Sequence, residues 1–145
     1  MSPVGFEHGV IAGRIYGHLL KFLEEHRLGM VTGAATGFQI GHDPDSVRAP
    51  DVGFICADRV PKGRIAGFFQ GAPDIAVEVV SPTDRAGELL AKVQDWLAAG
   101  CQVVWVVDPT PQTVTIYRTA RTTQNPTTDN GLLPGFRLPV AEIFG

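Results

Sequence analysis

The sequence predicts an α/β fold, with one mixed β-sheet and helices packed on it. Three observations lead to this prediction. The chain opens with an amphipathic helical pattern, a strand pattern in its middle runs directly into a second such helix, and a continuous apolar stretch follows that helix. A helix between two apolar strands is typical of a crossover that joins strands of one sheet. We therefore expect a single layer of mixed sheet with flanking helices.

The first predicted helix covers residues 8–28. Apolar residues recur in it at a spacing near 3.6 residues, which places them on one helical face. These residues are Val10, Ile11, Ile15, Leu19, Leu20, Leu23 and Leu28. Gly29 comes next, and glycine is a common stop signal, so we expect the helix to end there.

Three strands are expected after this helix, arranged as a meander. Residues 30–41 mix β-branched residues with glycine, which indicates a strand and its turn, and residues 41–46 (GHDPDS) indicate a loop. Residues 48–60 predict the second strand, with Pro50 near its start, where a missing N–H group is tolerated. A glycine-rich connection then leads to the third strand, residues 75–81.

The second predicted helix begins directly after the third strand. Ser81 or Thr83 is a suitable cap for it, and Gly100 is a suitable end. Residues 101–109 (CQVVWVVDP) form a continuous apolar run bounded by breakers, as expected of a central buried strand. Residues 113–118 alternate in the manner of a further strand.

The remaining part of the chain holds a polar loop, residues 122–131, and a tail, residues 133–145, which we expect to dock on an apolar surface.

The sequence contains no internal repeat. A chain of 145 residues has the length of one domain that can bury a core without a disulfide or a metal. We therefore expect a single domain over residues 1–145.

Composition and charge restrict the class of protein. No apolar run approaches the ~20 residues of a membrane span, and the N-terminus lacks the pattern of a secretory signal, so we expect a cytoplasmic protein and no membrane partner. Cys56 and Cys101 lie in apolar surroundings and are expected to be buried thiols, with a single disulfide as the alternative. The net charge of −3 argues against a protein that coats nucleic acid generally.

Positive charge is nevertheless concentrated in one region. Arg48, Arg59, Lys62 and Arg64 lie close together in a chain that has only 12 lysine and arginine residues. Such a cluster is able to contact the phosphates of a nucleic acid. The alternative is a solvated loop that binds nothing.

Glu78 is the most unusual residue of the predicted strands. In a strand, Ile75, Val77 and Val79 share one face, and Glu78 lies on the other face beside apolar neighbours. A carboxylate in such a half-buried position is costly unless a cation, a hydrogen-bond network or water compensates it. We therefore expect a cation, a hydrogen-bond network or water beside Glu78.

Asp51 and Lys92 are the candidates for this partnership. If the second and third strands are neighbours, Asp51 and Glu78 can meet on one face, and two converging carboxylates suit a hard cation such as Mg²⁺. Lys92 lies at the margin of the apolar stripe of the second helix, where its ammonium group could act on a water molecule or a phosphate. The alternative is a buried ion pair between Glu78 and Lys92.

The sequence also resembles a known family. The segments RAPDVGFI, PDIAVEVVSPTDR, KVQDWLAAGC, VVWVVDP and TVTIYR, together with the closing LPGFRLPVAEIF, are similar to those of the Uma2 family, from about Glu7 to the C-terminus. That family belongs to the PD-(D/E)XK restriction-endonuclease-like superfamily. The resemblance implies the αβββαβ core of the superfamily, which agrees with the order of elements expected above.

The resemblance also implies roles for individual residues. In the superfamily, the aspartate of the second strand and the acid of the third bind a divalent metal, which corresponds here to Asp51 and Glu78 with Mg²⁺ or Mn²⁺. The usual lysine position, two residues after the acid, holds Val80, which cannot act. Lys92 matches the lysine that the Uma2 pattern places on the following helix, and Gln94 is a weaker candidate for a polar helper.

Two further points concern the extent of this site. Asp74 shares a strand face with Glu78, but four strand residues separate their Cα atoms by about 13 Å, so Asp74 is a secondary candidate. Members of the family usually carry an N-terminal hairpin before the first helix, and this sequence lacks it. If a glutamate of that hairpin takes part in the site, Glu7 is only a poor substitute for it.

Other polar and aromatic residues carry less weight. His8, His18 and His26 lie in or beside the first helix, but their spacing does not produce a metal-binding pair. Trp96 and Trp105 are interpreted as core or interface aromatics, with base stacking as the alternative.

Three functions are therefore weighed. The first is a Mg²⁺- or Mn²⁺-dependent nuclease acting on nucleic acid, with DNA as the expected substrate, in which Asp51 and Glu78 hold the metal and Lys92 assists the attacking water. The second is a catalytically inactive nuclease-fold protein that binds nucleic acid or another protein. The third is a structural or interaction protein in which Glu78 and Lys92 form a buried ion pair. The apolar sheet and tail also lead us to expect a homodimer.

Overall fold

The computed structural model describes residues 3–118 and 131–145. Its elements are α1 (Phe6–Glu25), β1 (Gly29–Thr32), β2 (Phe38–Gly41), β3 (Ser46–Arg48), β4 (Val52–Cys56), η1 (Ala57–Arg59), β5 (Phe69–Gln70), β6 (Ile75–Val79), α2 (Ala86–Ala98), β7 (Val103–Asp108), β8 (Thr113–Arg118) and α3 (Val140–Phe144). The predicted polar loop at 122–131 lies outside the described residues except for its last position. Among the helices described, none combines the length and the hydropathy of a membrane span.

The main sheet has five strands in the order β1-β4-β6-β7-β8. Strands β1, β4 and β6 pair antiparallel, which confirms the predicted meander. Strand β6 runs parallel to β7, and the connection between them contains α2, which confirms the predicted crossover. Strand β8 closes the sheet antiparallel to β7. The α/β prediction, with a mixed sheet and flanking helices, is therefore confirmed.

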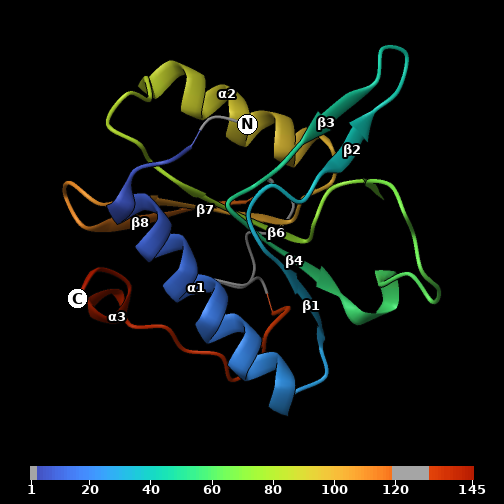
Figure 1. Ribbon diagram of the computed structural model, residues 1–145, viewed down its shortest axis with the longest axis horizontal. Helices are drawn as coiled ribbons and strands as arrows, with labels where there is room; N and C mark the ends of the chain where they lie inside the picture. Colours follow the sequence, from blue (N-terminus) through green and yellow to red (C-terminus); the bar gives the residue numbers. More distant parts are fainter. Residues whose placement is uncertain (1–2, 119–130) are drawn as a thin grey trace.

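The two long helices cover opposite faces of this sheet, as Figure 1 shows. The apolar residues of α1 pack against Ile75, Val77 and Val79 of β6, whereas Val93 and Trp96 of α2 belong to a second cluster that contains Ala76. Side chains along a strand alternate between faces, so each residue of β6 contributes to one layer only. The predicted alternation of this strand is therefore confirmed, and Glu78 falls on the α2 face.

A second, smaller sheet differs from the prediction. Residues 30–41 do not form one strand and its turn, because β1 belongs to the main sheet and β2 belongs to a sheet of order β3-β2-β5. The chain turns away between them, with Ala35 in the left-handed region (φ 65°). A Cβ on Gly37 would lie 2.5 Å from the exposed Phe68 ring, so a larger residue there would require that ring to move.

The boundaries of the first helix also differ. Helix α1 ends at Glu25, before the predicted stop, and Gly29 is the first residue of β1. A Cβ on Gly29 would overlap the backbone oxygen of Ile55 on β4. Glycine is therefore needed at this position for close strand pairing rather than for ending the helix.

The second helix starts later than predicted. Helix α2 begins at Ala86 after Arg85, and no side-chain hydrogen bond caps it. The N–H of Ser81 instead donates to Asp84 Oδ2 over 2.8 Å, so these residues form a separate turn before the helix. Gly100 ends the helix as predicted, with a left-handed φ of 104°.

The C-terminal tail docks on the α1 side of the sheet, as predicted. Leu133 and Ile143 are buried in the same apolar cluster as α1. Arg14 of α1 donates hydrogen bonds to the backbone oxygens of Ile143 (3.2 Å) and Gly145 (3.4 Å). The tail, which includes α3, therefore covers the apolar core beside α1 (Figure 1).

Candidate functional site

Asp51 and Glu78 are brought together by the pairing of β4 with β6. Val52 is the partner of Val77 in this antiparallel pair, so the residue before Val52 stands opposite the residue after Val77. The N–H of Asp51 donates to the backbone oxygen of Val77 over 3.0 Å, which extends the ladder by one residue. The register therefore places Asp51 opposite Glu78 at the point where β4 begins, and the charge of Asp51 acts on the pKa of Glu78. Their sharing of one metal ion stays a prediction.

One oxygen of each carboxylate is held by a hydrogen-bond donor. Asp51 Oδ2 accepts from the N–H of Val79 over 2.7 Å, and it lies 3.3 Å from Nε2 of His8. Glu78 Oε2 accepts from the indole N–H of Trp96 over 3.3 Å. Within the described parts of the chain, no hydrogen bond reaches Asp51 Oδ1 or Glu78 Oε1. Each carboxylate thus has one anchored oxygen and one oxygen free for a ligand.

Burial makes this pair electrostatically unusual. Glu78 is 4% exposed, and burial raises its pKa to about 7, with a further increase from the charge of Asp51. Burial likewise raises the pKa of Asp51, although the Val79 hydrogen bond and the charges of His8 and Lys92 oppose it. Asp51 is half-buried, with a side chain that is 22% exposed, so the raised pKa values belong to one buried and one half-buried carboxyl group. Carboxyl groups with such raised pKa values often mark functional sites.

Lys92 lies close enough to act on both carboxyl groups. It is half-buried on α2, one turn before Trp96. Burial dominates the pKa of each carboxyl, and the ammonium of Lys92 is the leading charge that lowers the pKa of Glu78. The charge of Lys92 therefore acts on both carboxyl groups, and no ion pair between Lys92 and either of them is found among the described residues.

Two of the four basic residues of the predicted cluster have partners inside the protein. Arg48 of β3 forms an ion pair with Asp95 of α2. Arg59 forms an ion pair with Asp74 over 2.9 Å and donates to the backbone oxygen of Ala72 over 2.8 Å. Both arginines thus have a structural role, and their contact with phosphates stays a prediction.

Lys62 and Arg64 are different from these two arginines. They are exposed on the segment between η1 and β5. No ion pair to either residue is found within 3–118 and 131–145. They remain candidates for phosphate contact.

The secondary candidates lie away from the carboxyl pair. Asp74 is buried, where it accepts hydrogen bonds from the N–H of Cys56 (2.8 Å) and from Gln102 Nε2 (3.3 Å) in addition to its ion pair with Arg59. These donors occupy the carboxylate in a structural role. Gln94 is exposed, and a residue two positions from Lys92 on a helix does not share its face. The structure therefore does not bring Gln94 or Asp74 to the site.

Two contributors were not identified from the sequence. His8 is one of the buried residues of α1, and its spacing from Ile11 and Ala12 is a signal that could have revealed this. Trp96 is a core residue as predicted, but it is also a donor to Glu78. A buried indole N–H needs an acceptor, and its position four residues after Lys92 points it toward the same region.

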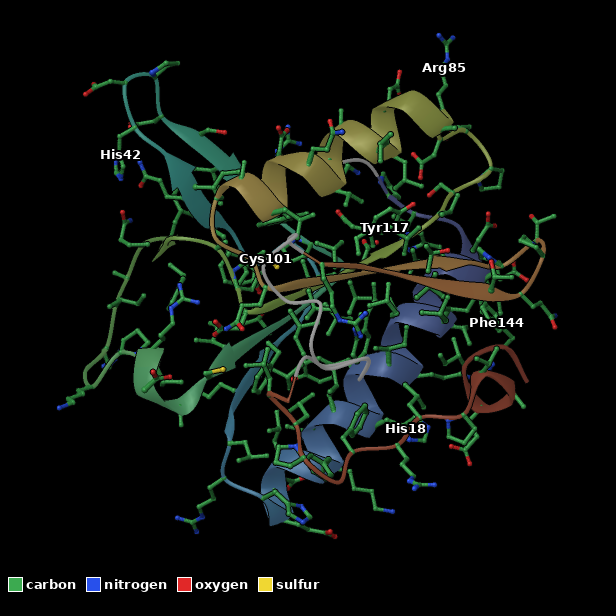
Figure 2. The ribbon with its side chains drawn as sticks, turned by 180° about the vertical axis from the view of Figure 1, so that it is seen from behind. His18, His42, Arg85, Cys101, Tyr117 and Phe144 are labelled. Atoms are coloured by element: carbon green, nitrogen blue, oxygen red, sulfur yellow. The ribbon has the colours of Figure 1, made fainter. Side chains whose placement is uncertain are left out.

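The cysteines and the other histidines lie outside this arrangement. Cys56 and Cys101 are free thiols, and burial raises the pKa of each to about 12. Figure 2 shows Cys101 between α2 and the sheet, with His42 on the β2–β3 hairpin and His18 beside the C-terminal segment. No cluster of three or more histidine, cysteine or acidic residues suited to a metal occurs in the part of the chain that is described.

A groove of about 550 Å³ adjoins Asp51, whereas Glu78 does not line it. His8 and Asp51 both line it, together with small residues of α1 and of the segments at 33–35 and 49–50. The groove is of the size that small-molecule and cofactor sites commonly have. Asp51 is thus open to a ligand on the side of α1, whereas Glu78 contacts Trp96 on the side of α2.

Comparison with known proteins agrees with this fold. A crystal structure of a "putative nuclease belonging to DUF820" from Anabaena variabilis matches with a TM-score of 0.81 and 22% sequence identity, over 99% of this chain and 83% of that chain. This likeness shows a shared fold. No protein with a curated description matches the chain. The model of the Uma2 family, described as "Putative restriction endonuclease", matches residues 1–141, and the chain therefore belongs to the Uma2 family.

Proposed function

We propose that the protein is a divalent-metal-dependent nuclease that hydrolyses phosphodiester bonds in DNA. Family membership supports a nuclease. The observation that carries the proposal is the placement of half-buried Asp51 opposite buried Glu78, in which each carboxyl group has one oxygen anchored by a donor and one oxygen free. Carboxylate oxygens are the ligands that Mg²⁺ and Mn²⁺ prefer, with water completing the coordination.

The chemistry of the residues fits such a cation. In the proposal, the carboxylates of Asp51 and Glu78 would hold the metal, each with one oxygen that is not engaged by a donor. The raised pKa of Glu78, about 7, indicates that burial leaves the pair short of positive charge, which a divalent ion would supply. When bound, the ion provides Lewis-acid stabilisation of charge on the phosphate.

Lys92 has a separate role in this reaction. Hydrolysis adds water to phosphorus and breaks one P–O ester bond, so negative charge builds up on the phosphate oxygens. The ammonium of Lys92, on the α2 side of the pair, can donate to such an oxygen or orient the attacking water. Arg48 stands nearby, since its charge also lowers the pKa of Glu78 against the dominant effect of burial.

Calorimetric titration with Mn²⁺ tests the metal site. The wild type should bind Mn²⁺ saturably. Asp51→Asn and Glu78→Gln should lose Mn²⁺ binding, because each replaces a charged carboxylate by a neutral amide of nearly the same shape. Glu88→Gln, an exposed acid on α2, is the matched control and should bind like the wild type. A folded wild type that does not bind Mn²⁺ would refute the proposal.

Nuclease assays then test the substrate. Supercoiled plasmid DNA, a single-stranded oligodeoxynucleotide and a matched RNA should be incubated with Mg²⁺ or Mn²⁺ and with EDTA. We expect cleavage of DNA that depends on the metal and is lost in Glu78→Gln. Cleavage of RNA alone would contradict the DNA part of the proposal and leave the metal part intact.

One observation favours a second candidate, a catalytically inactive protein of nuclease fold that binds nucleic acid or protein. The net charge is −3, and Arg48 and Arg59 are both engaged in internal ion pairs, which leaves little free positive charge for a long duplex. In this case Glu78→Gln would leave ligand binding intact. Fluorescence anisotropy with labelled DNA in the presence of EDTA distinguishes the two candidates.

We also propose a cytoplasmic location and a homodimer. The free thiols of Cys56 and Cys101 suit a reducing compartment. Large apolar side chains that are exposed, such as Phe6 at 89% and Phe68 at 54%, would be covered in an assembly. Sedimentation velocity over a range of concentrations measures the oligomeric state, and a monomer throughout would rule out the dimer.

A further inference from the structure

His8 is the polar member of an otherwise apolar helical face. The buried residues of α1 are His8, Ile11, Ala12, Ile15, Leu19 and Leu23, a spacing that turns all of them toward the sheet. The His8 side chain is 9% exposed. An apolar residue would fill this place in the core without the cost of burying an imidazole, so the polar group calls for a specific reason.

The surroundings of the imidazole determine how it is used. Its Nε2 lies 3.3 Å from Asp51 Oδ2. Its Nδ1 is buried and has no hydrogen-bond partner among the residues described. A proton on Nδ1 would have no acceptor, whereas a proton on Nε2 meets a carboxylate oxygen. Nε2 is therefore the nitrogen through which His8 can donate a proton to Asp51.

This donor completes the orientation of the Asp51 carboxylate. The N–H of Val79 on β6 donates to Oδ2 over 2.7 Å, and Nε2 of His8 on α1 lies 3.3 Å from the same oxygen. Two donors from different elements fix the plane of a carboxylate more firmly than one donor does. The opposite oxygen, Oδ1, is then held in one direction.

We propose that His8 is a positioning residue of the metal site, which orients Asp51 so that Oδ1 points to the cation. The proposal rests on the proposed function, because it assumes that Asp51 is a ligand. Groups that hold a metal ligand in place contribute to metal affinity although they do not touch the metal, and their loss commonly weakens binding about 10- to 100-fold.

Three variants of His8 test this role through Mn²⁺ affinity measured by calorimetry. His8→Leu keeps the bulk and removes the donor, and it should weaken binding about 10- to 100-fold. His8→Gln can place an amide N–H near the position of Nε2, so it should recover most of the affinity. His8→Asn has a shorter side chain that does not reach Asp51, and it should bind as weakly as His8→Leu.

The matched control is His18→Leu on the same helix. His18 is 39% exposed and lies 4.0 Å from Glu142 of α3, far from Asp51 in the fold. This variant should keep the wild-type affinity. Thermal unfolding of every variant without metal shows whether it is folded. If His8→Leu does not fold, the comparison of His8→Asn with His8→Gln still tests the proposal.

The outcomes separate this inference from the proposed function. If the wild type binds Mn²⁺, Asp51→Asn loses binding and a folded His8→Leu binds as the wild type does, the positioning role is refuted and the metal site stands. If His8→Gln is as weak as His8→Leu, the donor is not what matters, and the role is again refuted. If the folded wild type does not bind Mn²⁺ at all, both proposals fail together.

Discussion

Trp96 of α2 donates its indole N–H to Oε2 of Glu78 on β6 over 3.3 Å. Helix α2 thus carries both the donor that anchors Glu78 and, one turn earlier, Lys92. Glu78 is buried against this helix, and its burial raises its pKa to about 7. The hydrogen bond itself favours the charged form and partly offsets that effect.

Replacing Trp96 with Phe should separate the effect of the indole hydrogen bond from the effect of the ring's packing. The ring volume is largely kept, but Oε2 of buried Glu78 loses its donor, which should destabilise the protein by about 1–3 kcal/mol and weaken Mn²⁺ binding. Urea unfolding and calorimetry measure the two effects. Trp105→Phe on the other face of the sheet is the control, which should lose stability without loss of metal affinity. Unchanged Mn²⁺ affinity in Trp96→Phe would contradict the anchoring role.

The stability of the metal-free protein should depend on the ionisation of Glu78. Its folded pKa of about 7 exceeds the ordinary value of 4.5, so the folded state holds the proton more tightly than the unfolded state does. The contribution of this group to stability is therefore present below pH 4.5 and is lost as the pH rises toward 7, by up to about 3 kcal/mol. Urea unfolding in EDTA between pH 4.5 and 8 measures this loss.

The isosteric variant isolates this contribution from other titrating groups. Glu78→Gln cannot ionise, so the difference in unfolding free energy between Glu78→Gln and the wild type should grow in favour of the variant as the pH rises. Glu88→Gln, on the exposed side of α2, should show no such trend. A difference that stays constant with pH would mean that Glu78 titrates normally in the folded protein.

Lys92→Met should separate catalysis from metal binding. Methionine keeps most of the apolar stem and removes the charge. A positive neighbour repels a divalent cation, so Mn²⁺ affinity at pH 8 should be unchanged or higher, whereas cleavage should fall by about 10²–10³. Lys21→Met, a change at an exposed residue of α1, is the control and should keep the wild-type Mn²⁺ affinity and cleavage rate. Cleavage at the wild-type rate would remove Lys92 from the mechanism.

The thiols should be unreactive in the folded protein. Burial raises the pKa of Cys56 and of Cys101 to about 12, so at pH 8 almost no thiolate is present. Mass spectrometry after treatment with iodoacetamide should find both residues unmodified in buffer and both alkylated in urea. Rapid modification of Cys101 in the folded protein would contradict its burial between α2 and the sheet.

Much of the fold could be predicted because the relevant signals are local. The alternation of residues 75–79 and the apolar run of β7 are each legible within a few residues, and strand and helix periods differ enough to be told apart. The small sheet could not be predicted in this way. Strand β5 has two residues and pairs with β2 across a long separation in sequence, so no local period reveals it.

The candidate site, like the fold, was predicted from the sequence only in part. The sequence by itself predicted that Glu78 is at least half-buried, since it lies in a strand of apolar residues, and it singled out Asp51 and Lys92 as companions. Only the tertiary structure decided that His8 contacts Asp51, that Trp96 donates to Glu78, and that Arg48 and Arg59 form ion pairs with Asp95 and Asp74. Such pairs join elements whose relative placement depends on the packing of the whole core, and no local pattern in the chain encodes that placement.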